Sequence, residues 1–157
     1  LQGGIAGSFD AGTPPGKAVF IFEEILGDCG AAEKEGWMDL FDLALVKDEF
    51  PFTEKRLTNP HCSEWEKYGL PFVRSVSVSE ISTSPERINQ LRQKYRPVVE
   101  SMEGAAFHYV CLREHIPFMQ LRVVSNHVGE RNKLSWKLEE AIDQLNTELK
   151  KIITSLP

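Results

Sequence analysis

The second half of the chain alternates strand-like and helix-like segments, and this order constrains the fold more than any other feature. Residues 72–78 alternate apolar and polar side chains, which predicts a β-strand with one face toward solvent or a partner. Two further apolar runs, 98–99 and 118–124, each lie between segments whose apolar residues recur at helical spacing. A chain that passes from strand to helix to strand forms parallel strands covered by helices. The sequence therefore predicts a layered α/β domain.

Start signals locate the helices of this domain. Ser84-Pro85-Glu86 combines an N-cap residue, a first-turn proline and an acidic first turn, so a helix is expected to begin there. A stripe of apolar and small residues over 102–110 predicts a second helix that packs closely on the sheet. The longest stripe covers 138–153, and Ser135 is its best N-cap candidate.

The first half holds one clear strand and an irregular region. Residues 18–22 form a compact apolar run, which predicts a buried strand. Residues 47–69 are rich in charge, proline and polar side chains, so loops are expected there. Residues 1–8 are small and rich in glycine, which suits a strand end that turns sharply with its backbone exposed to a ligand.

Composition excludes several classes of protein. The 157 residues carry 18 basic and 23 acidic side chains, a net charge of -5. This charge, without a cluster of lysine and arginine, argues against nonspecific nucleic-acid binding. No run approaches the roughly 20 apolar residues of a membrane span and no signal peptide is recognisable, so a cytoplasmic protein is expected. The 3 cysteines are far apart and form no CxxC pair, which predicts neither a disulfide framework nor a zinc site.

Polar residues that follow apolar strands are the candidate functional residues, because ligands of α/β sheets bind at the carboxyl ends of strands. Glu100 and Glu103 stand between a short apolar run and a helix of small residues. Ser125 and Asn126 follow the apolar run that ends at Val124. These two places are where the sequence predicts chemistry.

Each candidate also has a purely structural interpretation. As helix-capping acids, Glu100 and Glu103 would each contribute at most about 1 kcal/mol to the following helix. Asn126 suits a turn, and His108 suits the face of a helix. Arg122 is harder to explain in this way, because a charged group inside an apolar strand needs a partner or an edge position.

Three motifs resemble, in order and spacing, those of the nucleoside phosphorylase and nucleosidase superfamily. They are Gly4-Ile5-Ala6-Gly7-Ser8, Glu100-Ser101-Met102-Glu103-Gly104-Ala105-Ala106 and Arg122-Val123-Val124-Ser125-Asn126. The tail 126–132, followed by Trp136, is most similar to the futalosine hydrolases of that superfamily. The resemblance implies a three-layer α/β/α sandwich with a central mixed sheet. It also implies an enzyme that releases hypoxanthine from futalosine in menaquinone biosynthesis, without metal or organic cofactor.

The resemblance assigns roles to individual residues. Glu103 matches the glutamate that binds the ribose, where one carboxylate accepts hydrogen bonds from two neighbouring hydroxyls. Met102 matches the apolar floor beneath the sugar. The Ala6-Gly7-Ser8 segment approaches the nucleoside through its backbone, because side chains there would block it.

Asn126 occupies the position at which adenine-specific nucleosidases have an aspartate. A carboxamide donates to purine N7 or O6 and stabilises the negative charge that moves onto the base as the glycosidic bond breaks. A 6-oxopurine offers these two acceptors side by side. Asn126 therefore favours hypoxanthine or guanine nucleosides.

Two arginines receive roles and two segments stay unassigned. The resemblance implies that Arg122 orients the asparagine loop. We expect Arg131, just beyond that loop, to meet the aryl carboxylate of futalosine through a bidentate pair. Glu100 is shifted by Ser101 relative to the commoner Glu-Met-Glu arrangement and has no assigned role. Residues 77–83 match the region that stacks on the base but hold no aromatic side chain.

Superfamily members begin with strands that precede the Gly-Ile-Ala-Gly segment. Residues 1–157 are therefore expected to form one nucleosidase-like domain that is the C-terminal part of a longer one, with the water-activating acid outside this chain. The expected partners are a small-molecule purine nucleoside and further copies of the chain, as a homo-oligomer. Three alternatives stay open: a purine nucleoside phosphorylase, a methylthioadenosine/adenosylhomocysteine nucleosidase, which Asn126 disfavours, and a nucleoside-binding fragment or degenerate homologue without activity.

Overall fold

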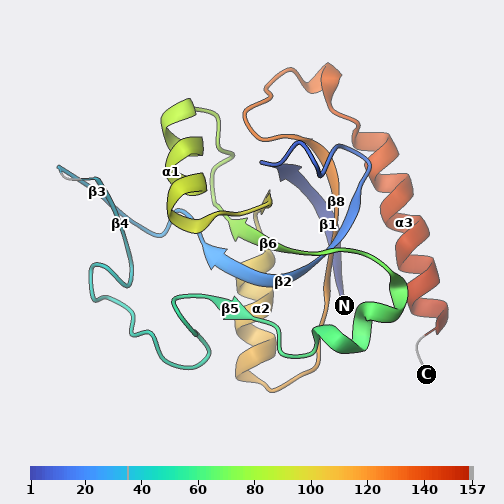
Figure 1. Ribbon diagram of the computed structural model, residues 1–157, viewed down its shortest axis with the longest axis horizontal. Helices are drawn as coiled ribbons and strands as arrows, with labels where there is room; N and C mark the ends of the chain where they lie inside the picture. Colours follow the sequence, from blue (N-terminus) through green and yellow to red (C-terminus); the bar gives the residue numbers. More distant parts are fainter. Residues whose placement is uncertain (35, 156–157) are drawn as a thin grey trace.

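Six strands form one mixed β-sheet in the computed structural model, which describes residues 1–34 and 36–155 (Figure 1). Their order across the sheet is β5-β2-β6-β7-β1-β8, and β2 also pairs with β8, so the sheet closes on itself. The strands are β1 (Gln2–Ser8), β2 (Ala18–Leu26), β5 (Leu57–Thr58), β6 (Phe72–Ser77), β7 (Val99–Ser101) and β8 (Gln120–His127). The predicted α/β fold with a mixed central sheet is confirmed.

Strand β2 closes the sheet. The buried strand predicted over 18–22 is confirmed and continues to Leu26. This strand pairs in parallel with β6 and antiparallel with β8, while β1 pairs in parallel with β8. Because successive residues of a strand point to opposite faces, β8 sends Leu121 and Val123 to the apolar layer under α3 (Leu138–Ser155). Gln120 and Arg122, which alternate with them along β8, point to the other face and are 0% and 3% exposed.

The polar face of β6 is also buried, which corrects the sequence prediction that it meets solvent or a partner. Ser75 is 0% exposed and Ser77 is 8% exposed. Ser77 Oγ donates to Oε2 of Glu24, which stands on the neighbouring strand β2. The alternation of apolar and polar residues in β6 therefore separates an apolar layer from a polar interior. Both faces of the strand are covered at this point, because the sheet is closed.

Helices cover the outside of the sheet (Figure 1). Helix α1 (Pro85–Tyr95) begins as predicted, with Ser84 Oγ accepting a hydrogen bond from the Arg87 amide at 3.1 Å. Its residues Leu91 and Tyr95 pack on the far end of β2 and β6. Helix α3 begins at Leu138, so the predicted N-cap Ser135 is wrong. That residue ends a short 3-10 turn, Lys133–Ser135, which the Asn132 side chain caps.

Helix α2 (Gly104–Arg113) exists as predicted, but its buried face differs from the predicted stripe. The buried residues are Gly104, Ala105, His108 and Cys111. Tyr109 and Val110 are 41% and 56% exposed. Small residues let the first turn approach the sheet closely, so the helix packs on its glycine–alanine–histidine side. His108 thus lies on a helix face as predicted, and this face is buried in the core.

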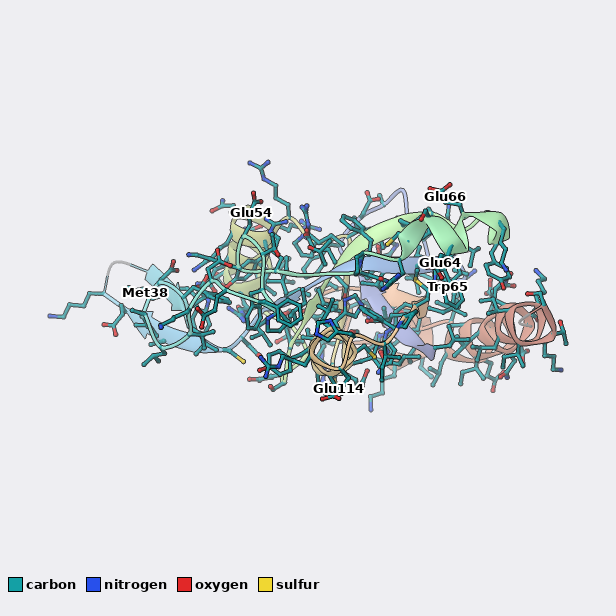
Figure 2. All side chains as sticks on the ribbon, turned by 90° about the horizontal axis from the view of Figure 1, so that it is seen from below. Met38, Glu54, Glu64, Trp65, Glu66 and Glu114 are labelled. Carbon is teal, nitrogen blue, oxygen red and sulfur yellow. The ribbon has the colours of Figure 1, made fainter. Side chains whose placement is uncertain are left out.

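A two-stranded arm, β3 (Gly30–Glu33) and β4 (Gly36–Asp39), projects from the sheet beside α1 (Figure 1). Figure 2 shows Met38 in this arm at one end of the molecule and the 3-10 segment of Trp65 toward the other. The arm is fastened to α1: Trp37 Nε1 donates to the Tyr95 hydroxyl at 3.3 Å, and Lys94 Nζ lies 3.0 Å from Asp39 Oδ2.

The loop-rich prediction for 47–69 is correct except for the short strand β5 and the 3-10 segment Cys62–Tyr68. None of the described helices is both long enough and apolar enough to cross a membrane.

Candidate functional site

A small pocket of about 240 Å³ opens where β1 and β8 end and β7 leads into α2. Because β1 and β8 are parallel, their carboxyl ends meet at one edge of the sheet, as the sequence predicts for ligand-binding residues. The pocket is lined by Ile5, Ala6, Gly7, Ile81, Glu100, Ser101, Met102, Glu103, Ser125, Asn126 and Trp136. The three sequence motifs that are far apart along the chain therefore line one pocket.

Glu103 stands in this pocket as an ion-paired carboxylate. Although it is the N-cap residue of α2, its side chain makes no capping hydrogen bond. Its Oε2 lies 3.0 Å from Nη1 of Arg122, which is 3% exposed. Arg122 reaches it past Gly4, where any Cβ would overlap the guanidinium. Glu103 therefore stands at the start of α2, as its structural interpretation predicts, but its carboxylate pairs with a buried cation at the pocket instead of bonding the helix amides.

A β-bulge in β8 sets the direction of the Asn126 side chain. The register between β1 and β8 shifts between Ala6 and Gly7, which leaves Ser125 as an extra residue on β8. Such bulges redirect the side chain that follows them. Ser125 Oγ donates to Oδ1 of Asn126 at 2.7 Å, and Asn126 Nδ2 donates to the His127 carbonyl at 3.0 Å. The carboxamide is thus fixed in orientation, and a second N–H of Nδ2 is left for a ligand.

Glu100 is a second carboxyl group in the wall of the pocket. It is 6% exposed, and its Oε1 accepts a hydrogen bond from the Ser82 amide at 3.1 Å. Its Oε2 is buried and has no partner among the described residues. Burial raises the pKa of Glu100, although the hydrogen bonds from Ser82 oppose this. The two carboxyl groups of the motif thus differ, since Glu103 pairs with a cation and Glu100 does not.

The structure brings most of the predicted site residues together. Ala6, Gly7, Met102, Glu103 and Asn126 all line the small pocket. Three other predicted residues stand outside its lining: Ser8, Arg122 and Arg131.

The three residues outside the lining have different surroundings. Ser8 is buried, and its hydroxyl donates to the Asp10 carbonyl at 2.9 Å. Arg122 lies behind Glu103, and its other hydrogen bonds go to the Ile5 carbonyl at 3.4 Å and to Gln2 Oε1 at 3.2 Å. Arg131 is an exposed residue of the loop after β8.

Six residues that line the pocket received no role from the sequence: Ile5, Ile81, Glu100, Ser101, Ser125 and Trp136. Ile81 belongs to residues 77–83, the segment that matches the base-stacking region, so an aliphatic rather than an aromatic side chain lines the pocket there. Trp136 belongs to the tail that carried the resemblance, and its Nε1 donates to the Glu130 carbonyl at 3.0 Å. Glu100 was noticed but left unassigned. In each case the signal in the sequence was its place in a segment that matches the superfamily.

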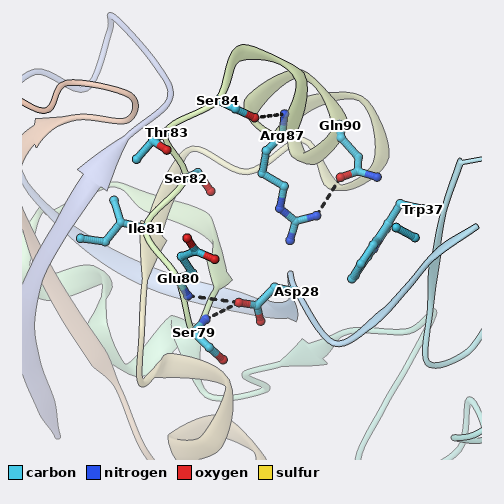
Figure 3. Close-up of a pocket in the computed structure, with 11 residues that line it drawn as sticks. Asp28, Trp37, Ser79, Glu80, Ile81, Ser82, Thr83, Ser84, Arg87 and Gln90 are labelled. Atoms are coloured by element: carbon cyan, nitrogen blue, oxygen red, sulfur yellow. Dashed lines mark hydrogen bonds between the residues drawn. The ribbon is translucent and has the colours of Figure 1, made fainter.

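A large cavity of about 630 Å³ adjoins the small pocket and shares Ile81 with it (Figure 3). Its polar groups bond one another: Asp28 accepts from the Ser79 and Glu80 amides, and Arg87 Nη1 donates to Gln90 Oε1 at 2.8 Å. The Arg87 guanidinium also lies 4.8 Å from the Trp37 ring centroid. Although this cavity is larger, Asp28 and Arg87 in its lining already have protein partners. The small pocket is therefore the better candidate site.

Comparison with known proteins agrees with this choice. A family model described as the phosphorylase superfamily matches residues 2–156. The futalosine hydrolase of Thermus thermophilus is 30% identical over 152 residues, which cover 96% of this chain and 67% of that protein. The futalosine hydrolase of Streptomyces coelicolor is 26% identical over 155 residues, covering 97% of this chain and 63% of that protein.

Solved structures share the fold. The futalosine hydrolase of Helicobacter pylori superimposes with a TM-score of 0.75 at 19% identity, covering 98% of this chain and 66% of that one. The 5'-methylthioadenosine/S-adenosyl homocysteine nucleosidase of the same organism gives a TM-score of 0.76 at 20% identity, with the same coverage. This chain thus spans 63% to 67% of the length of these relatives. On its sequence and its fold, the chain belongs to the phosphorylase superfamily.

Proposed function

We propose that this chain hydrolyses the N-glycosidic bond of futalosine and releases hypoxanthine, a step of menaquinone biosynthesis. The observation that carries the proposal is the meeting of Asn126 and Glu103 in one small pocket. The curated relatives of this chain are futalosine hydrolases, which supports the choice of substrate.

Glu103 binds the ribose in this proposal. Its carboxylate accepts hydrogen bonds from two neighbouring sugar hydroxyls, while Arg122 fixes Oε2 from behind. Met102 is 51% exposed and supplies an apolar surface for the sugar. The backbone of Ala6 and Gly7 forms the neighbouring wall. A sugar held in this way is oriented before positive charge develops at C1′.

Asn126 stabilises the departing base. As the bond between C1′ and the purine breaks, its electron pair moves onto the base, and the free N–H of Nδ2 donates to purine N7 or O6. Water adds its oxygen to C1′, and one of its hydrogens ends on the purine. Oδ1 is already occupied by Ser125, which keeps the donor rather than the acceptor of the amide toward the base. This orientation suits a 6-oxopurine.

Glu100 is available to a hydroxyl of the substrate or to water. Its buried Oε2 lacks a partner in the described structure, and such an atom is costly unless a ligand satisfies it. We place it at the sugar end of the pocket because it shares the motif of Met102 and Glu103.

A purine nucleoside phosphorylase is the first alternative. It requires a cationic site for phosphate, but no described side chain that lines the small pocket is basic. Arg122, which lies behind Glu103, is already paired with it. A methylthioadenosine/adenosylhomocysteine nucleosidase is the second, and the donor at Asn126 disfavours its 6-amino purine.

Release of free base from futalosine and inosine, measured with and without phosphate, tests the proposal. We expect hypoxanthine from futalosine without phosphate. Strict dependence on phosphate, with a sugar 1-phosphate as product, would make the chain a phosphorylase. Binding of nucleoside without release would support the non-enzymatic alternative. Release of adenine from methylthioadenosine in preference to hypoxanthine would support the second alternative.

Arg131 is proposed to bind the aryl carboxylate of futalosine. It follows Glu130, whose carbonyl holds the pocket residue Trp136, so the exposed loop that carries Arg131 borders the pocket. Arg131→Ala should raise the KM for futalosine by about tenfold, as expected for loss of a charge-assisted contact, and leave that for inosine unchanged. Equal effects on both substrates would contradict this role.

We further propose that the chain assembles as a homo-oligomer with the nucleoside site near a subunit contact. The mass of the purified protein in solution, measured over a range of concentrations, tests this. A monomer at all concentrations would contradict it.

A further inference from the structure

We propose that Glu24 is a positioning residue, held in its protonated form, that fastens the first turn of α2 and with it the ribose-binding Glu103. The assignment of a role toward Glu103 rests on the proposed function. The protonated state and the anchoring of the helix do not.

Glu24 lies inside the closed sheet, against the start of α2. It is 0% exposed. Its Oε2 accepts from Ser77 Oγ at 2.9 Å, and its Oε1 is 2.9 Å from Gln120 Nε2. A Cβ on Gly104 would overlap Oε1, so only glycine permits this close approach of helix and carboxyl. Strands β2, β6 and β8 therefore hold one carboxyl group against the helix start.

Two contacts connect Glu24 to the backbone beside Glu103. Ser77 Oγ accepts a hydrogen bond from the Ala105 amide at 2.8 Å while its own proton goes to Glu24. The second contact is the direct packing of Glu24 on Gly104, the residue that follows Glu103. The free amide groups of a helix start need such acceptors. The capping that Glu103 does not give α2 is thus supplied from the interior of the sheet.

The surroundings of Glu24 favour a neutral carboxyl group. The groups that face it are Ser75 and Ser77 from β6, Gln120 and Arg122 from β8, and Gly104 from α2. Among these, only Arg122 is charged, and it is paired with Glu103. Its neighbour along β2, Glu23, pairs with Arg56 and Arg74 instead. Burial raises the pKa of Glu24, and this effect exceeds the opposing hydrogen bonds.

His108 completes the argument for a proton on Glu24. Its ring is fully buried beside Gln120, and its Nδ1 donates to the Leu57 carbonyl at 3.0 Å. Burial lowers the pKa of His108 to about 4, so Nε2 is a bare acceptor near neutral pH. Both this Nε2 and Oε1 of Gln120 are buried and have no hydrogen-bond partner among the residues that the structure describes.

One arrangement satisfies all of these atoms. A half-turn of the Gln120 amide exchanges its oxygen and nitrogen without changing its shape. Its Nε2 then donates to His108, and its Oε1 accepts a proton carried by Glu24. An ionised Glu24 has no proton to give. Gln120 Oε1 would then face a second acceptor in either orientation of the amide, which is Oε1 of Glu24 in one and Nε2 of His108 in the other. The protonated acid is the state in which the buried network is complete.

The Glu24→Gln and Glu24→Ala variants test both parts of the proposal. A glutamine donates to Gln120 and accepts from Ser77 as a protonated glutamate does, so kcat and KM should stay within about threefold of the wild type. Glu24→Ala frees the helix start, and a shift of about 1 Å in a binding group can lower kcat by about 10²-fold, so we expect kcat to fall more than KM rises. If Glu24→Gln loses as much activity as Glu24→Ala, the protonated form is refuted.

Glu148→Ala is the matched control. Glu148 is a buried glutamate of α3, 7% exposed, that bonds Gln144 and Lys151 rather than α2. Both alanine variants remove a buried carboxyl group, but only Glu24→Ala should change kcat. Equal kcat in the two variants would overturn the positioning role.

Two measurements are independent of the proposed activity. Hydrogen exchange at the Ala105 amide should be about tenfold faster in Glu24→Ala, as for loss of one hydrogen bond, and unchanged in Glu24→Gln. The infrared difference between wild type and Glu24→Gln at neutral pH should contain the band of a protonated carboxyl group, and a carboxylate band would refute it. If both results hold but no nucleoside is cleaved, the proposed function fails and the anchoring of α2 stands.

Discussion

The small pocket and the large cavity adjoin each other and share Ile81, but their polar groups are used differently. In the large cavity, Asp28 and Arg87 bond other protein groups. In the small pocket, Oε2 of Glu100 has no partner in the described structure, and Asn126 keeps an N–H free. The wall of the large cavity also holds a buried hydroxyl without a partner in the described structure, Ser82 Oγ. An unpartnered carboxyl oxygen costs more free energy than an unpartnered hydroxyl, so Glu100 indicates a ligand more strongly than the larger volume does. The predictions below test this difference between the two regions.

Replacement of Asn126 should have the largest effect. Asn126→Ala removes the donor to the departing base, and loss of one such donor lowers kcat by about 10²–10³-fold. Asn126→Asp should also abolish hypoxanthine release near neutral pH, because a carboxylate there accepts but does not donate. The measurement is kcat for hypoxanthine release from futalosine.

Ser125→Ala is the matched control for Asn126. It removes the bond to Oδ1 but keeps the carboxamide, so its loss in kcat should be smaller than that of Asn126→Ala. If Asn126→Ala retains full activity, the small pocket does not bind the base.

Glu103→Gln should have the next largest effect. The amide keeps the shape of the side chain but loses the charge that binds two sugar hydroxyls. Charge-assisted hydrogen bonds contribute about 1.5–3 kcal/mol, which corresponds to a loss of about 10–100-fold in kcat/KM. The loss should be smaller for nucleosides without the 2′- or 3′-hydroxyl, because these substrates already lack one of the bonds. An equal loss for all of them would argue against ribose binding by Glu103.

Glu100→Gln should change the pH dependence of stability more than the activity. The raised pKa of Glu100 means that the folded protein binds its proton more tightly than the unfolded chain does. Its contribution to stability is therefore complete below the pKa of the unfolded chain and is lost as the pH rises through the folded pKa. Glutamine cannot ionise, so the variant should gain stability relative to wild type as the pH rises.

The difference in the free energy of unfolding between the two proteins is measured by denaturant unfolding at several pH values from about 4 to about 9. This range begins near the usual pKa of a glutamate and extends well above it. The kcat/KM of the variant should fall only about fivefold, as for one neutral hydrogen bond. A stability difference that does not vary with pH would show that Glu100 titrates normally.

Local signals in the sequence predicted much of the fold and the site. Ser84 caps α1 as expected, because capping depends only on residues within one turn. The residues of the three motifs also meet as expected, since each motif lies at the carboxyl end of a strand.

Features that depend on distant pairing were not predicted. The closure of the sheet between β2 and β8 turns Gln120, Arg122 and Ser77 toward a polar interior, which a strand pattern alone does not distinguish from a solvent face. The contact of Arg122 with Glu103 joins β8 to the start of α2 across this interior, and so required the fold to be known.

Arg87→Ala should have the smallest effect on activity, and it tests the large cavity directly. Arg87 donates to Gln90 and to the Gly27 carbonyl and lies over the Trp37 ring, so it joins α1 to the end of β2 and to the arm (Figure 3). Its loss should lower the free energy of unfolding by about 1–2 kcal/mol, from the hydrogen bonds and the cation–π contact together. Because these are contacts within the protein, kcat/KM for futalosine should stay within about twofold, well inside the tenfold that corresponds to 1.4 kcal/mol.

Gln90→Ala, which removes only one of the contacts, should lie between wild type and Arg87→Ala in stability. If Arg87→Ala instead retains stability and loses activity more than Glu103→Gln does, the ligand occupies the large cavity and the comparison of the two regions is reversed.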